Sequence, residues 1–146
     1  LMVANLLAHT DLFTAGIARS GSYNKTNQPF GFQGERRSLF EATDSYINCS
    51  PTFFADKVNE PVLIIHGDDD SNPGTLTFQS EVFYEAVRGS GGTARLVLLP
   101  FEDHGYRAKE SIEHVLWEQI NWFDQYVKNQ PKVSKHSYMN LMEIKN

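Results

Sequence analysis

Two short polar segments carry side-chain types that hydrolytic chemistry uses, and each follows an apolar run. Three consecutive aspartates, residues 68–70, follow the aliphatic run 62–65, whereas Asp103 and His104 follow the run 94–99. Neighbouring parallel strands lie about 4.8 Å apart, so loops at their carboxyl ends can bring a carboxylate to an imidazole. Such an imidazole takes the proton of a hydroxyl nucleophile, and the carboxylate fixes its tautomer and stabilises the imidazolium. The two segments therefore predict the acid and the base of a hydrolytic triad.

The third member of a triad, a serine on a G-x-S-x-G turn, has no match in the sequence. In the α/β-hydrolase order the nucleophile precedes the acid, the acid precedes the histidine, and the nucleophile turn opens a helix. Residues 1–9 have apolar side chains at helical spacing and fit the remainder of that helix. We therefore expect the serine just before residue 1, and we expect residues 1–146 alone to be inactive.

A calcium loop and an ordinary acidic turn are two other interpretations of the aspartates. Asp68, Asp70 and Asn72 fit the first three ligand positions of a calcium loop. However, Pro73 and Gln79 occupy the sixth and twelfth positions, where glycine and glutamate belong. The histidines show no zinc-binding spacing either, so we predict neither a metal nor a cofactor. From residue types alone, a solvated acidic turn and a helix-capping histidine stay open as an alternative.

The apolar pattern indicates the elements that must position these segments. The run 62–65 is continuously aliphatic and rich in β-branched residues, which is typical of a parallel strand covered on both faces. Runs at 13–18 and 94–99 predict two more strands, and helical patterns begin at Leu76 and span 112–126. Strands that alternate with helices favour right-handed crossovers and a parallel sheet flanked by helices. The predicted fold class is therefore α/β.

A long segment, residues 22–59, separates the first two predicted strands. It is rich in aromatic and polar residues without a strict period, and only residues 35–43 have a weak helical pattern. A connection of this length in a compact domain is usually functional or built from short helices. We expect it to form a rim or lid over a cleft.

Composition argues against several classes of protein. The 146 residues, 40% hydrophobic and 21% charged, suit one soluble domain with its own core. The net charge is −5 and no basic cluster exceeds the pair Arg36 and Arg37, which argues against nucleic-acid and anionic-membrane partners. No apolar run reaches the roughly 20 residues that span a bilayer, and the first nine residues make a poor signal peptide. A single cysteine, Cys49, excludes an internal disulfide, and no pattern indicates a compartment.

Two segments, IHGDDDSNPGT at 65–75 and HGY at 104–106, each contain a His-Gly dipeptide. Together with residues 16–24, 29–37 and 110–118, they resemble the catalytic domain of the prolyl oligopeptidase family of serine peptidases. Within that family they are most similar to the glutamyl endopeptidase branch. A joint match of five segments by chance is improbable.

The resemblance implies that residues 1–128 are the C-terminal part of an α/β-hydrolase domain that cleaves peptides without a cofactor. It implies that Asp70, the fourth residue after the first His-Gly histidine, is the triad acid and that His104 is the base. In the family, the upstream half of the hydrolase domain and a β-propeller that admits peptides precede these segments. The remaining residues, 129–146, read as a polar and weakly patterned tail.

Cleavage after Glu or Asp, which this branch implies, requires a cation at the substrate site. A guanidinium matches carboxylate geometry, so Arg19, Arg36 and Arg37 are candidate substrate-binding residues, with Arg19 first because it follows a predicted strand. Surface solubility explains each arginine equally well. Two other functions also stay open: an esterase or other acyl hydrolase of the same fold, and a non-catalytic fragment that binds a partner through a bare sheet edge.

Overall fold

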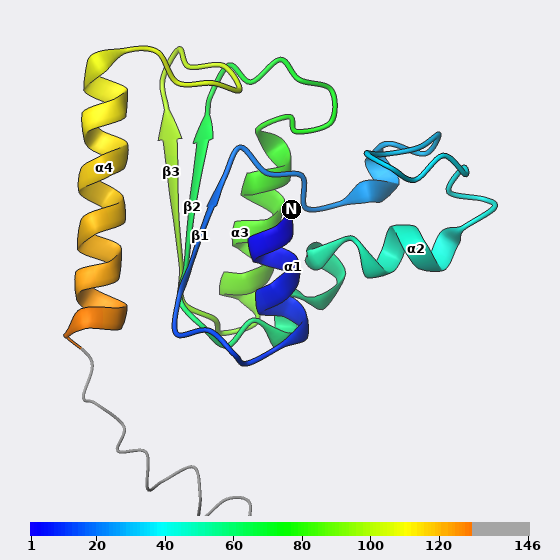
Figure 1. Cartoon of the computed structure of the whole chain (residues 1–146), viewed down its shortest axis with the longest axis horizontal. Helices are drawn as coiled ribbons and strands as arrows, with labels where there is room; N and C mark the ends of the chain where they lie inside the picture. Colours follow the sequence, from blue (N-terminus) through cyan, green and yellow to red (C-terminus); the bar gives the residue numbers. More distant parts are fainter. Residues whose placement is uncertain (130–146) are drawn as a thin grey trace, which may run out of the picture.

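Three parallel strands form the centre of the molecule. The computed structural model describes residues 1–129. Its sheet has the order β1 (Gly16–Arg19), β2 (Val62–Gly67) and β3 (Ala94–Leu99) (Figure 1). β2 pairs in parallel with both neighbours, so that Ile65 lies opposite Arg19 on one side and Val97 on the other. Because the strands run the same way, their carboxyl ends meet at one edge of the sheet.

Helices cover both faces of this sheet (Figure 1). They are α1 (Met2–His9) and α3 (Phe78–Gly89) on one face and α4 (Lys109–Phe123) on the other. Alternate side chains of β2 enter two cores: Val62 and Ile64 pack with α1 and α3, whereas Leu63 and Ile65 pack with α4. All six residues of β2 are buried, which explains the uninterrupted aliphatic run. The predicted α/β class with a parallel sheet flanked by helices is confirmed.

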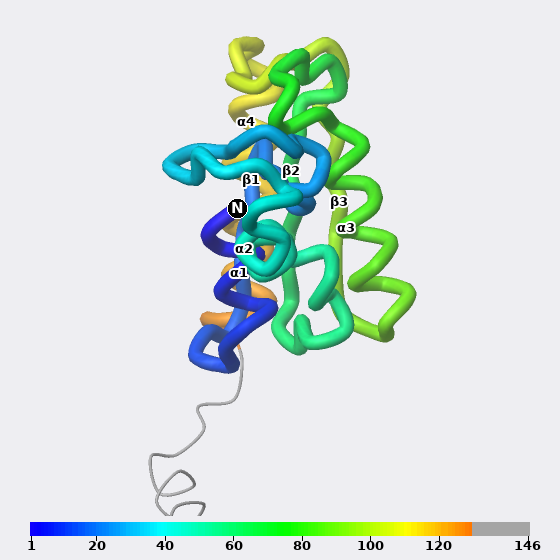
Figure 2. Tube along the Cα trace, turned by 90° about the vertical axis from the view of Figure 1, so that its right-hand side faces the viewer, coloured from blue at the N-terminus to red at the C-terminus, as the bar shows by residue number. Residues whose placement is uncertain are grey.

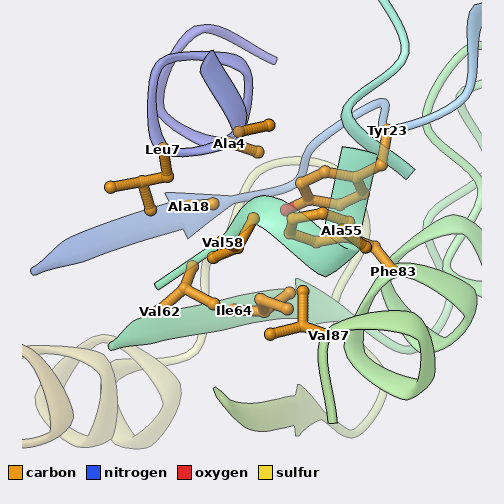
Figure 3. Packing of buried hydrophobic residues seen from close by; sticks show 11 residues of the cluster. Ala4, Leu7, Ala18, Tyr23, Ala55, Val58, Val62, Ile64, Phe83 and Val87 are labelled. Atoms are coloured by element: carbon orange, nitrogen blue, oxygen red, sulfur yellow. The ribbon is translucent and has the colours of Figure 1, made fainter. Parts of the chain in front are cut away.

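The core on the α1 and α3 face also fixes the start of the long segment after β1 (Figure 3). Tyr23 is fully buried and stacks on Phe83 of α3, with ring centroids 4.7 Å apart. Leu7 of α1 and Ala18 of β1 belong to the same buried cluster. Because Tyr23 follows β1 so closely, this contact holds the chain against α3 as it leaves the sheet.

The N-terminal end of α1 faces the edge where the strands end. α1 runs antiparallel to the three strands, so its first residue, and not its last, lies toward their carboxyl ends (Figures 1 and 2). The expected nucleophile turn, which would directly precede α1, would therefore reach the same edge.

The segment 22–59 contains short helices at places that the sequence pattern did not predict. They are η1 (Lys25–Asn27), α2 (Thr43–Asn48) and η2 (Pro51–Lys57). η2 packs against α1 and α3, whereas α2 projects from the body of the molecule (Figure 1). Whether this segment acts as a rim or lid stays a prediction.

The prediction of a weak helix at residues 35–43 is wrong. Phe32 and Glu35 form an isolated antiparallel bridge around Gln33, whose φ is 49°, and this turn directs the chain away from helical geometry. The carboxylate of Glu41 then accepts hydrogen bonds from the Ser38 backbone N–H at 2.8 Å and from its hydroxyl at 2.7 Å. These local bonds stabilise a turn, so the helix begins only at residue 43.

Several boundaries differ from the predicted ones by two or three residues. The first strand begins at Gly16 and not at residue 13, because Leu12 and Phe13 are exposed. Helix α3 begins at Phe78, and α4 begins at Lys109 and continues into a π-helical turn, η3 (Asp124–Lys128). The predicted tail, residues 129–146, lies outside the described residues except for its first. Within residues 1–129, no helix has the length and apolar character needed to cross a bilayer.

Candidate active site

Asp70 is held in the loop that follows β2. Its side chain is fully buried, and its two oxygens accept hydrogen bonds from several directions. The backbone N–H of Asn72 donates to Oδ1 at 2.9 Å, a local turn that aspartate favours after a strand. Oδ2 accepts hydrogen bonds from His66 Nε2 at 2.7 Å, from His104 Nδ1 at 2.9 Å and from the hydroxyl of Thr75 at 3.3 Å. The carboxylate is therefore fixed in one orientation.

His104 comes from the loop after β3, so the two loops predicted to meet do meet. An ionised carboxylate only accepts hydrogen bonds, so His104 Nδ1 donates to Asp70 and Nε2 is the basic nitrogen of a neutral ring. The His104 side chain is 46% exposed, and no hydrogen bond from residues 1–129 reaches its Nε2. The arrangement therefore combines a buried carboxylate with a half-exposed imidazole whose second nitrogen has no hydrogen-bond partner among residues 1–129.

The surroundings of Asp70 favour its ionised form. Burial raises the pKa of the Asp70 carboxyl, but hydrogen bonds from His104, from the Asn72 backbone and from His66 outweigh this effect. The pKa of Asp70 therefore lies below its ordinary value. A carboxylate that stays ionised can stabilise an imidazolium on His104, which is its role in a triad.

The two loops approach closely because residue 67 has no side chain. A Cβ at Gly67 would collide with the carbonyl oxygens of Glu102 and Asp103, next to His104. The Asp103 carboxylate joins the loops from the other side, since it accepts the Ser71 N–H at 2.9 Å and the His104 N–H at 2.8 Å. These hydrogen bonds lower the pKa of Asp103, and the bond from Ser71 has the largest effect. Asp103 thus holds the loop of His104, whereas Asp70 contacts its imidazole.

His66 contacts the candidate acid, although the sequence pattern gave it no role beyond the His-Gly dipeptide. It is fully buried. Its Nε2 bonds to Asp70 Oδ2 and its Nδ1 lies 2.5 Å from the hydroxyl of Ser80 in α3. Asp70 therefore has an imidazole on both sides. The spacing of four residues between His66 and Asp70 was visible in the sequence. Ser80 lies ten residues beyond Asp70, and nothing in the sequence indicated that it bonds His66.

The three arginines predicted to bind substrate lie in different surroundings. The guanidinium of Arg19 lies over the ring of Tyr106, 4.8 Å from its centroid, close to the loop of His104. Arg37 forms a two-point ion pair with Glu35, with distances of 3.0 and 2.6 Å. Arg36 is exposed. The structure therefore places Arg19 beside the paired loops and leaves the guanidinium of Arg37 already occupied.

The aspartates after β2 do not gather around a common point. Asp68 and Asp69 are exposed, whereas Asp70 points inward to the two histidines. Among residues 1–129, no three or more His, Cys, Asp or Glu side chains are arranged to hold a metal ion.

Comparison with known proteins identifies related sequences. The sequence profile of the prolyl oligopeptidase family matches residues 1–130. The chain is 57% identical over 126 residues to a probable chloroplastic glutamyl endopeptidase of Oryza sativa subsp. japonica, and equally to one of Arabidopsis thaliana. Each match covers 86% of this chain and 13% of the relative. The chain thus spans about an eighth of the length of these relatives.

Solved structures share the fold. The acylaminoacyl peptidase of Pyrococcus horikoshii superimposes with a TM-score of 0.71 at 24% identity, over 94% of this chain and 24% of that protein. At that level of identity the likeness concerns the fold alone. The three strands and their helices are therefore arranged as in part of a larger domain.

Proposed function

Because this chain belongs to the prolyl oligopeptidase family, we propose that it supplies the acid and the base of a serine peptidase. The observation that supports this best is the 2.9 Å contact between Asp70 Oδ2 and His104 Nδ1 at the strand ends. It joins a buried carboxylate to an imidazole whose side chain is 46% exposed. The same pair would serve an esterase, so family membership is what favours peptides as substrates.

In the proposed mechanism, His104 Nε2 takes the proton from a serine hydroxyl as its oxygen attacks the peptide carbonyl. The ionised Asp70 holds the His104 ring through Nδ1 and stabilises the imidazolium that forms. His104 then gives the proton to the leaving amine, which departs and leaves an acyl-serine. Water attacks this ester with His104 again as base, and the acid product leaves. The serine is expected on the turn before α1, which faces this edge of the sheet.

We also propose that the whole protein cleaves after acidic residues, as the names of its relatives suggest for those proteins. Such a preference requires a cation near the strand ends. Of the three arginines, Arg19 is the best placed, because it lies at the carboxyl end of β1 and contacts Tyr106 near His104. Arg36 and Arg37 lie on the segment that leaves β1, where exposed cations would attract an acidic peptide.

The expected partner of this chain is the upstream half of the same hydrolase domain. Within residues 1–129, β1 has no strand on its outer side, so its edge is available for pairing. An apolar cavity of about 240 Å³ opens beside it, lined by Val3, Leu6, Leu7, Phe13, Ala15, Gly16, Ile17 and Phe123. Apolar side chains beside a bare strand edge suit further strands and helices of the same sheet.

Peptide hydrolysis by the full-length protein that contains these residues tests the proposal. His104→Ala and Asp70→Asn should abolish hydrolysis. His114→Ala is the matched control, because His114 is 48% exposed and lies 3.4 Å from a carboxylate, that of Glu118, but forms no hydrogen bond or ion pair with Asp70. Its hydrolysis rate should equal that of the wild type. Unchanged hydrolysis in the His104 and Asp70 variants would refute the proposed roles.

A second measurement distinguishes the alternatives. Ester hydrolysis without turnover of any peptide would favour an esterase. Residues 1–146 alone should hydrolyse neither substrate, because they contain no serine on a G-x-S-x-G turn. Hydrolysis by this segment alone that depends on His104 would show that another nucleophile acts.

A further inference from the structure

Lys25 is a buried cation that lacks a carboxylate partner. The residue is only 3% exposed, although lysine is rarely buried unless its charge is paired. Its ammonium makes a long hydrogen bond of 3.5 Å to Gln28 Oε1 and lies 5.2 Å from the ring centroid of Phe32. It forms no ion pair with any carboxylate of residues 1–129. A charge withdrawn from water in this way favours the approach of an anion.

The neighbours of Lys25 place it next to the loop of Asp70. The amide group of Gln28 packs against Gly74, whose missing Cβ leaves room for it. Gln79 joins the same two segments, because it accepts the Tyr23 N–H at 2.9 Å and donates to the Gly74 carbonyl at 3.0 Å. The ammonium is therefore one side chain away from the loop that holds the proposed acid.

Lys25 also lies near Leu1, the residue directly before α1. Its ammonium is close enough to the backbone nitrogen of Leu1 to interact with it electrostatically. Figure 1 shows the ribbon that leaves β1 passing beside the start of α1. Lys25 thus lies between the start of α1, where we expect the nucleophile, and the loop of Asp70. The side chain of a bound peptide would occupy this region.

We propose that Lys25 binds the carboxylate of the substrate residue whose carbonyl is attacked, and so determines cleavage after Glu or Asp. This inference rests on the proposed function and adds the residue that selects the substrate. An ion pair formed away from water is stronger than one at the surface, so a buried ammonium separates Glu from the isosteric Gln. Arg19 offers less, because it is exposed and lies on the sheet face that α4 covers, over Tyr106.

The electrostatics of the unbound state agree with this role. Burial lowers the pKa of Lys25, so its charged form is disfavoured until an anion arrives. A bound carboxylate would offset this cost of burial, whereas a glutamine side chain would not.

The test compares peptides that differ only in Glu or Gln before the cleaved bond, with the full-length protein that contains these residues. Lys25→Met keeps an unbranched apolar stem on Phe32 and removes the charge. The ratio of kcat/KM for Glu over Gln should fall by about 10- to 100-fold, while cleavage after Gln stays near the wild-type rate. Lys25→Arg should retain part of the preference. If Met is not tolerated, Lys25→Gln gives the same comparison.

Lys57→Met is the matched control, because the Lys57 ammonium also lies 5.2 Å from a ring centroid, that of Phe54, but the residue is exposed. The Glu to Gln ratio should not change in this variant. Arg19→Met tests the alternative that Arg19, and not Lys25, binds the substrate carboxylate. Loss of the preference in Arg19→Met, with the preference kept in Lys25→Met, would overturn the proposal in favour of Arg19.

Other outcomes separate this inference from the proposed function. Peptide cleavage by the wild type without preference for Glu would refute the role of Lys25 and leave the peptidase proposal standing. Binding of acetyl-glutamate and acetyl-glutamine, measured by calorimetry, requires no turnover. The wild type should bind acetyl-glutamate at least 10-fold more tightly and Lys25→Met should not; equal binding by the wild type would overturn the inference even if no peptide were cleaved.

Discussion

The two sides of Asp70 contrast in their exposure to solvent. Through the same oxygen, Asp70 bonds His66 at 2.7 Å on the inner side and His104 at 2.9 Å on the outer side. The inner imidazole is 0% exposed and is bonded at both nitrogens, whereas the outer one is 46% exposed. Residue type and the shared Asp70 oxygen are thus the same, whereas exposure and the second hydrogen bond, to Ser80, distinguish the buried histidine from the one that a reactant can reach.

The largest expected effect, on kcat, comes from His104, the exposed histidine on the outer side of Asp70. His104→Ala should lower kcat about ten-thousand-fold, as loss of a triad member does elsewhere. The free energy of unfolding should change by no more than about 1 kcal/mol, because a half-exposed side chain is removed. Enzyme assays and chemical denaturation of the full-length protein measure the two quantities. A large loss of stability here would remove the contrast between the two sides.

Replacement of His66, on the inner side of Asp70, should affect stability more and turnover less than replacement of His104. His66→Ala removes the bonds to Asp70 and Ser80 and leaves both buried groups without that partner, which should cost about 2–4 kcal/mol of stability. Turnover should fall less than in His104→Ala, because Asp70 keeps His104 and Asn72. Denaturation midpoints and kcat for the two histidine variants, measured side by side, decide this. A smaller stability loss in His66→Ala than in His104→Ala would contradict the interpretation.

Gly67→Ala tests the contact that lets the two sides meet. A methyl group there overlaps the carbonyl oxygens of Glu102 and Asp103, so stability should fall by about 1–3 kcal/mol. The displaced loop would carry His104 with it, and an error of about 1 Å in catalytic geometry can cost about 100-fold in rate. Gly105→Ala is the control, because no atom of residues 1–129 lies within 4 Å of its added Cβ. Equal behaviour of the two variants would show that the close approach is unimportant.

A smaller effect on stability is expected from Ser80, which bonds the buried His66 on the side away from Asp70. Ser80→Ala leaves His66 Nδ1 without its hydroxyl partner and should cost about 1–2 kcal/mol. The kcat value should change little, since Asp70 keeps all its own bonds. In combination with His66→Ala the second change should cost almost nothing, because the bond is already lost. Full additivity of the two stability losses would argue against a shared bond.

The pH dependence of stability gives the finest comparison. The folded-state pKa of Asp70 is lowered, so its contribution is complete above the unfolded-state value of about 3.9 and is lost as pH falls through the lower folded value. The stability advantage of the wild type over Asp70→Asn should be constant above about pH 5 and shrink below about pH 4. In His66→Ala one of the bonds that lowers this pKa is gone, so the loss should begin at a higher pH. Urea denaturation between pH 3 and 7 measures both, and a pH-independent advantage would contradict the assignment.

Much of the fold could be predicted because it depends on local patterns. The run at 62–65 gave a buried strand, since only a strand covered on both faces tolerates continuous β-branched side chains. The helices after β2 and β3 followed from apolar periodicity. The prediction failed at residues 35–43, where a left-handed Gln33 and the bonds between Ser38 and Glu41 stabilise turns. Side-chain bonds of this kind leave no periodic signal.

The site could be predicted only where chemistry follows a strand directly. Asp70 and His104 were identifiable because each lies in a loop after an apolar run, and parallel strands bring such loops together. The contact of His66 with Asp70 was not predicted, because the position of its second partner, Ser80, depends on the packing of α3. Lys25 was not considered, because nothing in the residues around it indicates that its ammonium is withdrawn from water.

The order of strands, acids and histidines was determined by the sequence alone, since it depends on which residue types follow which apolar runs. Tertiary structure decided which Asp70 oxygen is shared, which imidazole stays accessible and which cation is buried. Those properties arise from contacts between residues 14 to 56 positions apart, such as His66 with Ser80 and Gln79 with Tyr23 and Asn24. Burial and charge pairing depend on everything that surrounds a side chain, and its neighbours along the chain are only a small part of that.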